Sequence, residues 1–218
     1  MPRVLITGAS GLLGGNLTML LPKDWEITGI VHEHLMMPQS YHVGIRQTDL
    51  LTEDIEALIS SFQPLDAVIH TAALTNVDRC EMRKRESWHL NALLPKRLAQ
   101  ACARQNVHLI HISTDHVFDG KKGNYSEDDE PHPVNYYAES KCAAEEFVGE
   151  AGGTFTIIRT NFFGYYVQRK RGIAGWILQT LERHDPLTLF TVEFIAEFVG
   201  LAIGVIFSIT RKFDTVSR

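Results

Sequence analysis

Short apolar runs alternate with segments of helical periodicity along most of the chain, and this alternation constrains the fold more than any single motif. The runs that indicate strands cover Arg3–Gly8, Trp25–His32, a short piece of 41–50, Asp66–Ala73, Val107–Thr114 and a sixth stretch beginning at Thr154. Helical segments are expected at Leu12–Leu21, 54–64 and 91–106. Alternating strands and helices form parallel βαβ units. The sequence therefore predicts an α/β fold, a Rossmann-type doubly wound parallel sheet.

The charge balance limits the partners that such a protein can have. The 218-residue chain has a formal net charge of −5 and a pI near 6.0, whereas proteins that bind nucleic acid or anionic membranes usually carry a basic stripe. The uncharged run Phe198–Thr210 is too short to cross a bilayer. We therefore expect no nucleic-acid partner and no membrane partner.

Cysteine and histidine usage points to a reduced compartment without a metal centre. Cys80, Cys102 and Cys142 are widely spaced and include no C-x-x-C pair, and the chain begins without the pattern of a secretory signal. We therefore expect a cytoplasmic protein. The histidines show no metal-ligand spacing, so no metal is expected, and the histidines within the expected strands are interpreted as neutral.

The first strand is followed directly by a glycine-rich turn with the spacing G-x-x-G-x-x-G. Glycine lets the backbone turn tightly and approach a pyrophosphate, which the free N–H groups of the next helix can then bind. The alternative is a purely structural turn, but the position between the first strand and first helix favours dinucleotide binding. The predicted cofactor contacts in this turn are Gly8, Ser10, Gly11, Leu12 and Gly14.

The second strand offers a clue to which dinucleotide is bound. Enzymes that prefer NAD usually place an acidic residue at the end of this strand to hold the ribose 2′-hydroxyl. Here the strand ends in His32, with Glu33 one step later, and His32, His34 or Arg46 could tolerate a 2′-phosphate. The sequence therefore favours NADP (NADPH), with NAD as the alternative.

Other strand ends are expected to complete the cofactor site. Asp49 and Leu50 follow the third strand, where the carboxylate could accept from the adenine amino group and the leucine could pack on the ring. At the end of the fourth strand, the small side chains of Thr71, Ala72 and Ala73 would let the cofactor ribose approach.

A tyrosine and a lysine four residues apart, Tyr137 and Lys141, lie at the start of the helix after the fifth strand, which ends at Thr114. When a hydride reaches a carbonyl carbon, charge develops on oxygen, and the site then needs a proton donor, a second hydroxyl and a cation. We expect Lys141 to lower the pKa of Tyr137 and to bind the nicotinamide ribose, so both residues are also cofactor contacts. In the alternative reading, Tyr137 packs on the sheet and Lys141 is solvated.

The motifs TGASGLLG, STDHVFDG, YYAESK and RTNFFG resemble those of the extended short-chain dehydrogenase/reductase superfamily, and within it the dTDP-4-dehydrorhamnose reductase family. The resemblance implies reduction of the 4-keto group of a nucleotide-linked 6-deoxy sugar in dTDP-L-rhamnose biosynthesis. It implies that Thr114, Tyr137 and Lys141 are the catalytic residues. It also implies that Asn91 and Asp115 lie at the substrate.

Two positions depart from the family pattern. His116 replaces a tyrosine, and Phe162 stands where tryptophan is typical; both are expected to face the sugar, so another keto-sugar is an option. Residues 1–164 are expected to form the NAD(P)-binding domain with the catalytic residues. Residues 165–218 are expected to form a small C-terminal substrate lobe that looks incomplete beside the family's longer lobe.

Alternatives to a reductase remain open at this stage. The regulatory beta subunit of methionine adenosyltransferase resembles the same family, so a cofactor-binding subunit without catalysis is the main one. An epimerase or dehydratase is weaker, because Asp115 is followed by His116 rather than by a second carboxylate. The sequence sets no oligomeric state, and a homodimer is kept as an option.

Overall fold

The computed structural model describes residues 1–33, 43–162, 180 and 182–183. Within these ranges, six strands form one sheet in the order β3-β2-β1-β4-β5-β6, and all neighbouring strands run parallel. The strands are β1 (Arg3–Thr7), β2 (Glu26–Val31), β3 (Val43–Gln47), β4 (Ala67–His70), β5 (His108–Ile112) and β6 (Phe155–Ile158). The predicted doubly wound sheet is confirmed. The C-terminal lobe expected at 165–218, with the run Phe198–Thr210, lies outside the described residues except for 180 and 182–183.

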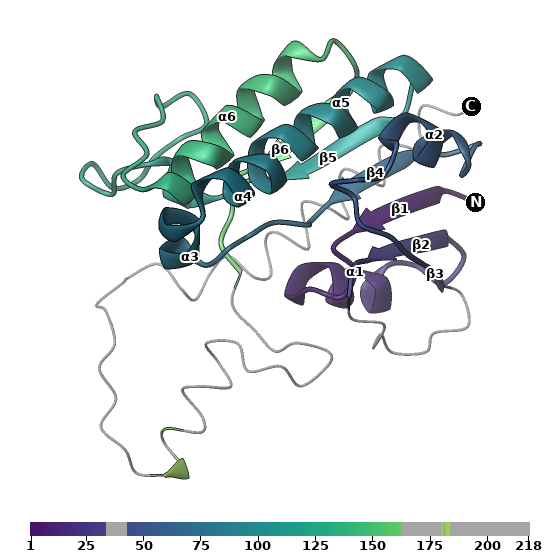
Figure 1. Cartoon of the computed structure of the whole chain (residues 1–218), viewed down its shortest axis with the longest axis horizontal. Helices are drawn as coiled ribbons and strands as arrows, with labels where there is room; N and C mark the ends of the chain where they lie inside the picture. The colour runs from purple at the N-terminus through teal and green to yellow at the C-terminus, as the bar shows by residue number, and fades with distance from the viewer. Residues whose placement is uncertain (34–42, 163–179, 181, 184–218) are drawn as a thin grey trace.

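The helices lie on both faces of this sheet (Figure 1). They are α1 (Leu12–Leu20), α2 (Ile55–Ser60), α3 (Val77–Met82), α4 (Lys84–Trp88), α5 (Leu94–Gln105) and α6 (Tyr136–Glu150). A π-helical turn, η1 (His89–Leu93), joins α4 to α5, and a 3₁₀ turn, η2 (Asp115–Val117), follows β5. Figure 1 shows α2, α4, α5 and α6 on one face, and α1 on the other.

Asparagine side chains cap the N-termini of α3 and α6. Asn135 accepts a hydrogen bond from the backbone N–H of Ala138 at 2.9 Å, which satisfies a free donor of the first turn of α6. Asn76 caps α3 in the same way through the N–H of Arg79 at 2.7 Å. The cap on α6 fixes where that helix starts, and so fixes the turn that carries Tyr137 and Lys141.

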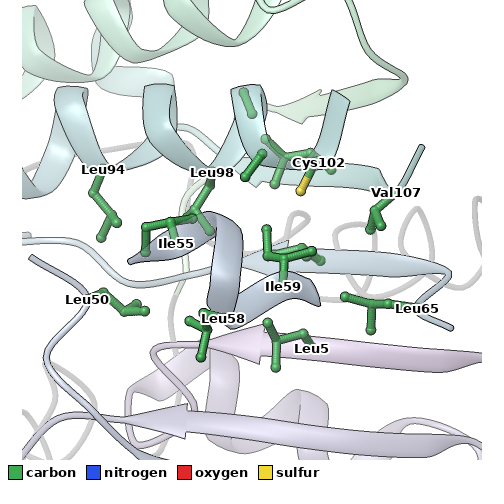
Figure 2. Packing of buried hydrophobic residues seen from close by; sticks show 14 of the residues in the cluster. Leu5, Leu50, Ile55, Leu58, Ile59, Leu65, Leu94, Leu98, Cys102 and Val107 are labelled. Atoms are coloured by element: carbon green, nitrogen blue, oxygen red, sulfur yellow. The ribbon is translucent and has the colours of Figure 1, made fainter. Parts of the chain in front are cut away.

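Alternate residues of the central strands enter two separate hydrophobic clusters, as expected for a sheet covered on both faces. Leu5, Val68 and Leu109 pack under α2 and α5 with the residues drawn in Figure 2. The intervening residues of the same strands, such as Ile6 and Ile69, pack on the α1 side. Both clusters hold the carboxyl ends of β1, β4 and β5 in a fixed register.

Candidate active site

The glycine turn after β1 is pressed against the end of β4. Gly8 has a φ of +70°, and a Cβ added to it would lie 2.7 Å from the backbone nitrogen of Ala72. A Cβ on Gly14 would lie 2.4 Å from the carbonyl oxygen of Gly8. Thr71 ties the two strand ends together, because its hydroxyl donates to the carbonyl of Thr7 at 2.7 Å. Only glycine fits this close approach of turn, helix and strand.

The N-terminus of α1 is free of side chains that would compete with an anion. Its capping residue is Gly11, no side chain caps it, and its first turn carries no acidic residue. Ser10 and Leu12 flank this residue and are half-buried. The free N–H groups and the positive end of the helix dipole fit a pyrophosphate. The expected contacts of the glycine turn stay predictions, and the geometry suits them.

The ends of β2 and β3 meet next to this turn. The exposed imidazole of His32 lies 4.0 Å from the carboxylate of Asp49, and Gln47 donates to the His32 carbonyl at 2.8 Å. The guanidinium of Arg46 lies 3.7 Å from the carboxylate of Glu53. Its charge is thus paired with Glu53 and not with the carboxylate of Asp49. His34, the third residue considered for a 2′-phosphate, lies outside the described residues.

The side chain of Leu50 is largely buried. It is only 7% exposed and packs in the same hydrophobic cluster as Leu58, which Figure 2 also labels. Little of this side chain is left free at the surface, and its expected contact with an adenine ring stays a prediction. Asp49, directly before it, remains accessible.

Thr114 leads a tight turn at the end of β5. Its Oγ1 accepts from the N–H of His116 and donates to a carboxylate oxygen of Asp115, both at 3.2 Å. Asn161, after β6, donates to the other carboxylate oxygen of Asp115 at 3.5 Å. The ring of His116 meets that of Tyr137 edge to face, with centroids 5.9 Å apart. The structure thus gathers these side chains from β5, β6 and α6 at one edge of the sheet.

Lys141 is buried between α6 and β5 rather than solvated. Its side chain is 2% exposed, and its Nζ donates to the carbonyl of Ile112 at 2.7 Å and contacts His111 Nε2 at 3.2 Å. Burial lowers the pKa of Lys141 to about 8, and the carboxylate of Glu145 acts in the opposite direction. The alternative reading of a solvated lysine is excluded.

The effect expected of Lys141 on Tyr137 is absent from this arrangement. Burial raises the pKa of Tyr137 to about 12, the negative charge of Asp115 adds to the rise, and a hydrogen bond with Thr114 opposes it. The expectation that a nearby ammonium lowers the Tyr137 pKa is therefore wrong here, because the ammonium is bound to β5 instead. Tyr137 stays a neutral hydroxyl at neutral pH.

Asn91 was expected at the substrate, but its side chain is fully buried within η1. Its amide oxygen accepts from the N–H of Leu74 at 2.8 Å, and its amide nitrogen donates to the Leu74 carbonyl at 3.0 Å and to Ser140 Oγ at 3.2 Å. The amide is thereby committed to the protein. It ties the segment after β4 to α6, one residue before Lys141.

We predict that Asn91→Ala lowers the free energy of unfolding by about 3 kcal/mol, because the buried N–H and C=O of Leu74 lose their partner. Urea denaturation measures this change. Gln100→Ala, at an exposed position of α5, is the control and should be nearly neutral. Equal stability of the two variants would contradict the structural role of Asn91.

Sequence reasoning missed an ion pair that braces the site. Arg159, after β6, binds the carboxylate of Glu145 through Nε at 3.0 Å and Nη2 at 2.8 Å. The hydroxyl of Ser113 donates to the same carboxylate. Glu145 lies one turn beyond Lys141 on α6. The i, i+4 spacing of Lys141 and Glu145 was a signal that could have drawn attention to this carboxylate.

The expected neutrality of the buried histidines is confirmed. Burial lowers the pKa of His70 to about 3, and it lowers the pKa of His111 well below its usual value; the charge of Lys141 adds to both shifts. Above the unfolded-state pKa of 6.5 these groups bind no proton in either state. Below 6.5 the unfolded chain binds protons that the folded chain does not, so stability falls as the pH falls.

We therefore predict that His70→Leu removes about one proton from the pH dependence of unfolding between pH 6.5 and 4. The slope of the free energy of unfolding should fall by about 1.4 kcal/mol per pH unit relative to the parent chain. Urea titrations at several pH values measure both slopes. Parallel slopes would show that His70 titrates normally in the folded protein.

In the described part of the chain, the three cysteines are free. No cluster of histidine, cysteine or carboxylate side chains there could hold a metal ion. No helix among the described residues is long and apolar enough to span a membrane. Phe162 is partly buried and packs against the α1-side cluster.

Comparison with known protein families decides the identity of this fold. The family model of the RmlD substrate binding domain matches residues 2–194. The chain belongs to this family. A probable low-salt glycan biosynthesis reductase, Agl14, of Haloferax volcanii is 33% identical over 192 residues, which are 85% of this chain and 63% of that protein. A dTDP-4-dehydrorhamnose reductase of Aggregatibacter actinomycetemcomitans is 36% identical over 169 residues, 76% of this chain and 53% of that protein. This RmlD-family chain thus spans less than two thirds of either relative.

The similar proteins also include a methionine adenosyltransferase subunit and solved structures of reductases. The beta subunit of methionine adenosyltransferase 2 from Danio rerio is 35% identical over 145 residues, 66% of this chain and 42% of that protein. Among solved structures, a hypothetical dTDP-4-dehydrorhamnose reductase from Sulfolobus tokodaii superposes with a TM-score of 0.70 at 34% identity, covering 85% of this chain and 63% of that one. A Bacillus anthracis dTDP-4-dehydrorhamnose reductase in complex with NADP superposes with a TM-score of 0.68 at 28% identity, covering 84% of this chain and 61% of that one.

Proposed function

We propose that this protein is a nicotinamide-dependent reductase of a nucleotide-linked 4-keto-6-deoxy sugar, as its relatives' names indicate for dTDP-4-dehydrorhamnose. One observation carries the proposal. Thr114, Tyr137 and the buried Lys141 gather at the carboxyl edge of the sheet that also holds the glycine turn. In this proposal, residues 1–164 bind the cofactor and supply the catalytic residues, and residues 165–218 belong to a partial substrate lobe.

The residues after β1 suit a dinucleotide. A Cβ at Gly8 or Gly14 would fill the space between turn and strand, and the capping residue Gly11 leaves the helix N–H groups free for a pyrophosphate. Thr71, Ala72 and Ala73 would contact the ribose, and Asp49 would meet the adenine. We favour NADP(H), because the exposed His32 stands where NAD enzymes usually carry a carboxylate.

In the proposed reaction, the protein supplies a proton and orients the carbonyl group of the sugar. When bound, the nicotinamide supplies a hydride to the carbonyl carbon. Tyr137 then gives its hydroxyl proton to the carbonyl oxygen as charge develops there. Its raised pKa, about 12, keeps the hydroxyl protonated at neutral pH, which is the state that a reduction requires. Thr114 donates the second hydrogen bond to the same oxygen.

Lys141 supplies the cation behind these hydroxyls. In the proposal, its ammonium, held on Ile112 and His111, donates a hydrogen bond to a hydroxyl of the nicotinamide ribose. On the substrate side, Asp115, His116 and Phe162 would contact the sugar. Asn91 would act at a distance by holding α6 in place, because its amide is already paired.

The test is cofactor oxidation by the full-length protein with dTDP-4-keto-6-deoxy-L-mannose, run separately with NADPH and NADH. We expect saturable loss of NADPH absorbance that depends on the keto-sugar, with slower loss of NADH. Binding of NADPH without turnover of this sugar or of other nucleotide-linked keto-sugars would exclude the reductase assignment.

The second candidate is a cofactor-binding regulatory subunit without catalysis. It is favoured by the 35% identity to the beta subunit of a methionine adenosyltransferase. This candidate would be favoured over the reductase if the tagged protein recovered a methionine adenosyltransferase in equal amount and turned over no keto-sugar.

A further inference from the structure

Three neighbouring strands present a buried polar row just before their carboxyl ends. Thr7, His70 and His111 stand opposite one another in the register of β1, β4 and β5. Each is at most 1% exposed. Two residues earlier on the same face, the corresponding row is wholly apolar, with Leu5 and Val68 among its members. Polar side chains in such a position require partners, because burying an unpaired polar group is costly.

The row is connected from side to side and ends at Lys141. Thr7 Oγ1 lies 2.7 Å from His70 Nδ1, and the rings of His70 and His111 are stacked with centroids 5.5 Å apart and planes at 22°. His111 Nε2 lies 3.2 Å from Lys141 Nζ. The contacts therefore form one path across the sheet to the lysine.

The chemistry of the last contact fixes the tautomer of His111. An ammonium group only donates hydrogen bonds, so His111 Nε2 must carry a lone pair and the ring proton must sit on Nδ1. A protonated His111 would place a second cation against the lysine. Within the described residues, His111 Nδ1 and His70 Nε2 are buried without a protein partner, so the contact with Lys141 is the one that selects between the two His111 tautomers.

We propose that His111 is a positioning residue, which aims Lys141 by accepting one ammonium proton while the Ile112 carbonyl accepts another. This inference rests on the proposed reductase function, since it concerns the same lysine. With two donors held on β5, the third remains free to donate to a bound cofactor. His70 and Thr7 keep the imidazole in place by stacking and by a hydrogen bond, and so act behind it.

Other charged groups near Lys141 are committed elsewhere. Glu145, one turn further on α6, is bound by Arg159 and by the hydroxyl of Ser113, so it acts on the lysine through space and not by contact. Tyr137, one turn earlier, is neutral. Among the described side chains that contact the ammonium, His111 is thus the one whose removal changes its hydrogen bonding.

The test compares His111→Leu, which removes the acceptor, with His111→Gln, whose amide oxygen can replace Nε2. His108→Leu is the matched control, because His108 lies on the same strand and pairs with Thr156 on β6. Loss of the acceptor disfavours the charged lysine. In His111→Leu we expect kcat/KM to fall about ten-fold and the alkaline limb of its pH profile to move to lower pH. His111→Gln should restore most of both, and His108→Leu should leave the profile unmoved.

A second readout does not depend on turnover. In the full-length protein labelled with ¹⁵N-histidine, nitrogen NMR should show His111 neutral, with Nδ1 protonated and Nε2 bare, and Lys141→Met should shift the Nε2 signal. A protonated Nε2, an insensitive signal, or equal damage from the Leu and Gln variants would overturn the proposal. If no keto-sugar is turned over but the NMR result holds, the reductase assignment fails while the positioning of Lys141 by His111 stands.

Discussion

Tyr137→Phe should reduce turnover of the keto-sugar by roughly a thousand-fold while leaving cofactor affinity nearly unchanged. The change removes one hydroxyl and keeps the ring, so the edge-to-face contact with His116 at 5.9 Å can persist. The carbonyl oxygen then loses its proton donor, and Thr114 alone cannot replace it, because its hydroxyl must supply the other hydrogen bond. Steady-state kinetics and NADPH binding by fluorescence measure the two quantities separately.

The neighbouring tyrosine provides the control for this substitution. Tyr136 packs near Trp88, with ring centroids 6.4 Å apart, and the ammonium of Lys84 lies 4.9 Å from its ring centre. Tyr136→Phe should therefore retain parental turnover. A Tyr137→Phe protein with more than a tenth of parental activity would show that another group delivers the proton.

Gly14→Ala should lower NADPH affinity about a hundred-fold and reduce the free energy of unfolding by about 2 kcal/mol. The added Cβ would lie 2.4 Å from the Gly8 carbonyl oxygen and 2.8 Å from the Thr71 hydroxyl, so α1 must move away from the turn and from Thr71. Because two of the three closest atoms are backbone, side-chain adjustment cannot absorb the clash. Moving α1 displaces the N–H groups that would hold the pyrophosphate. Fluorescence titration and urea denaturation measure the two effects.

A glycine in open space serves as the matched control. Gly149 lies on the exposed side of α6, and a Cβ built there meets nothing within 4 Å. Gly149→Ala should leave NADPH affinity unchanged and stabilise the protein by about 0.5–1 kcal/mol, since alanine is the better helix former. If Gly14→Ala bound NADPH as tightly as Gly149→Ala, the glycine turn would not be the pyrophosphate site.

Much of this architecture could be predicted from the sequence because its signals are local. The apolar runs and their spacing predict the strands, and the turn after β1 predicts where a dinucleotide lies. Parallel strands place their carboxyl ends at one edge, so Thr114 and Tyr137 could be brought together without a structure. The resemblance to a family added the proposed reaction, and the match over residues 2–194 confirms the family.

Other features depend on contacts between distant residues, and the sequence does not encode them locally. The paired amide of Asn91 needs Leu74 and Ser140, which arrive from a loop and from another helix. The short helices α3 and α4 were not expected, because their sequence is strongly charged; an asparagine cap and ion pairs such as Arg79 with Glu86 support them. Burial, which sets the pKa of Tyr137, is likewise a property of the packed molecule.

Transfer of deuterium from the reactive face of [4-²H]NADPH tests the central claim most directly. The purified protein is incubated with labelled cofactor and dTDP-4-keto-6-deoxy-L-mannose, and the sugar product is examined by mass spectrometry and NMR. The account predicts one deuterium at C4 of the product sugar, absent with Tyr137→Phe. An unlabelled sugar from a protein that binds NADPH would contradict it.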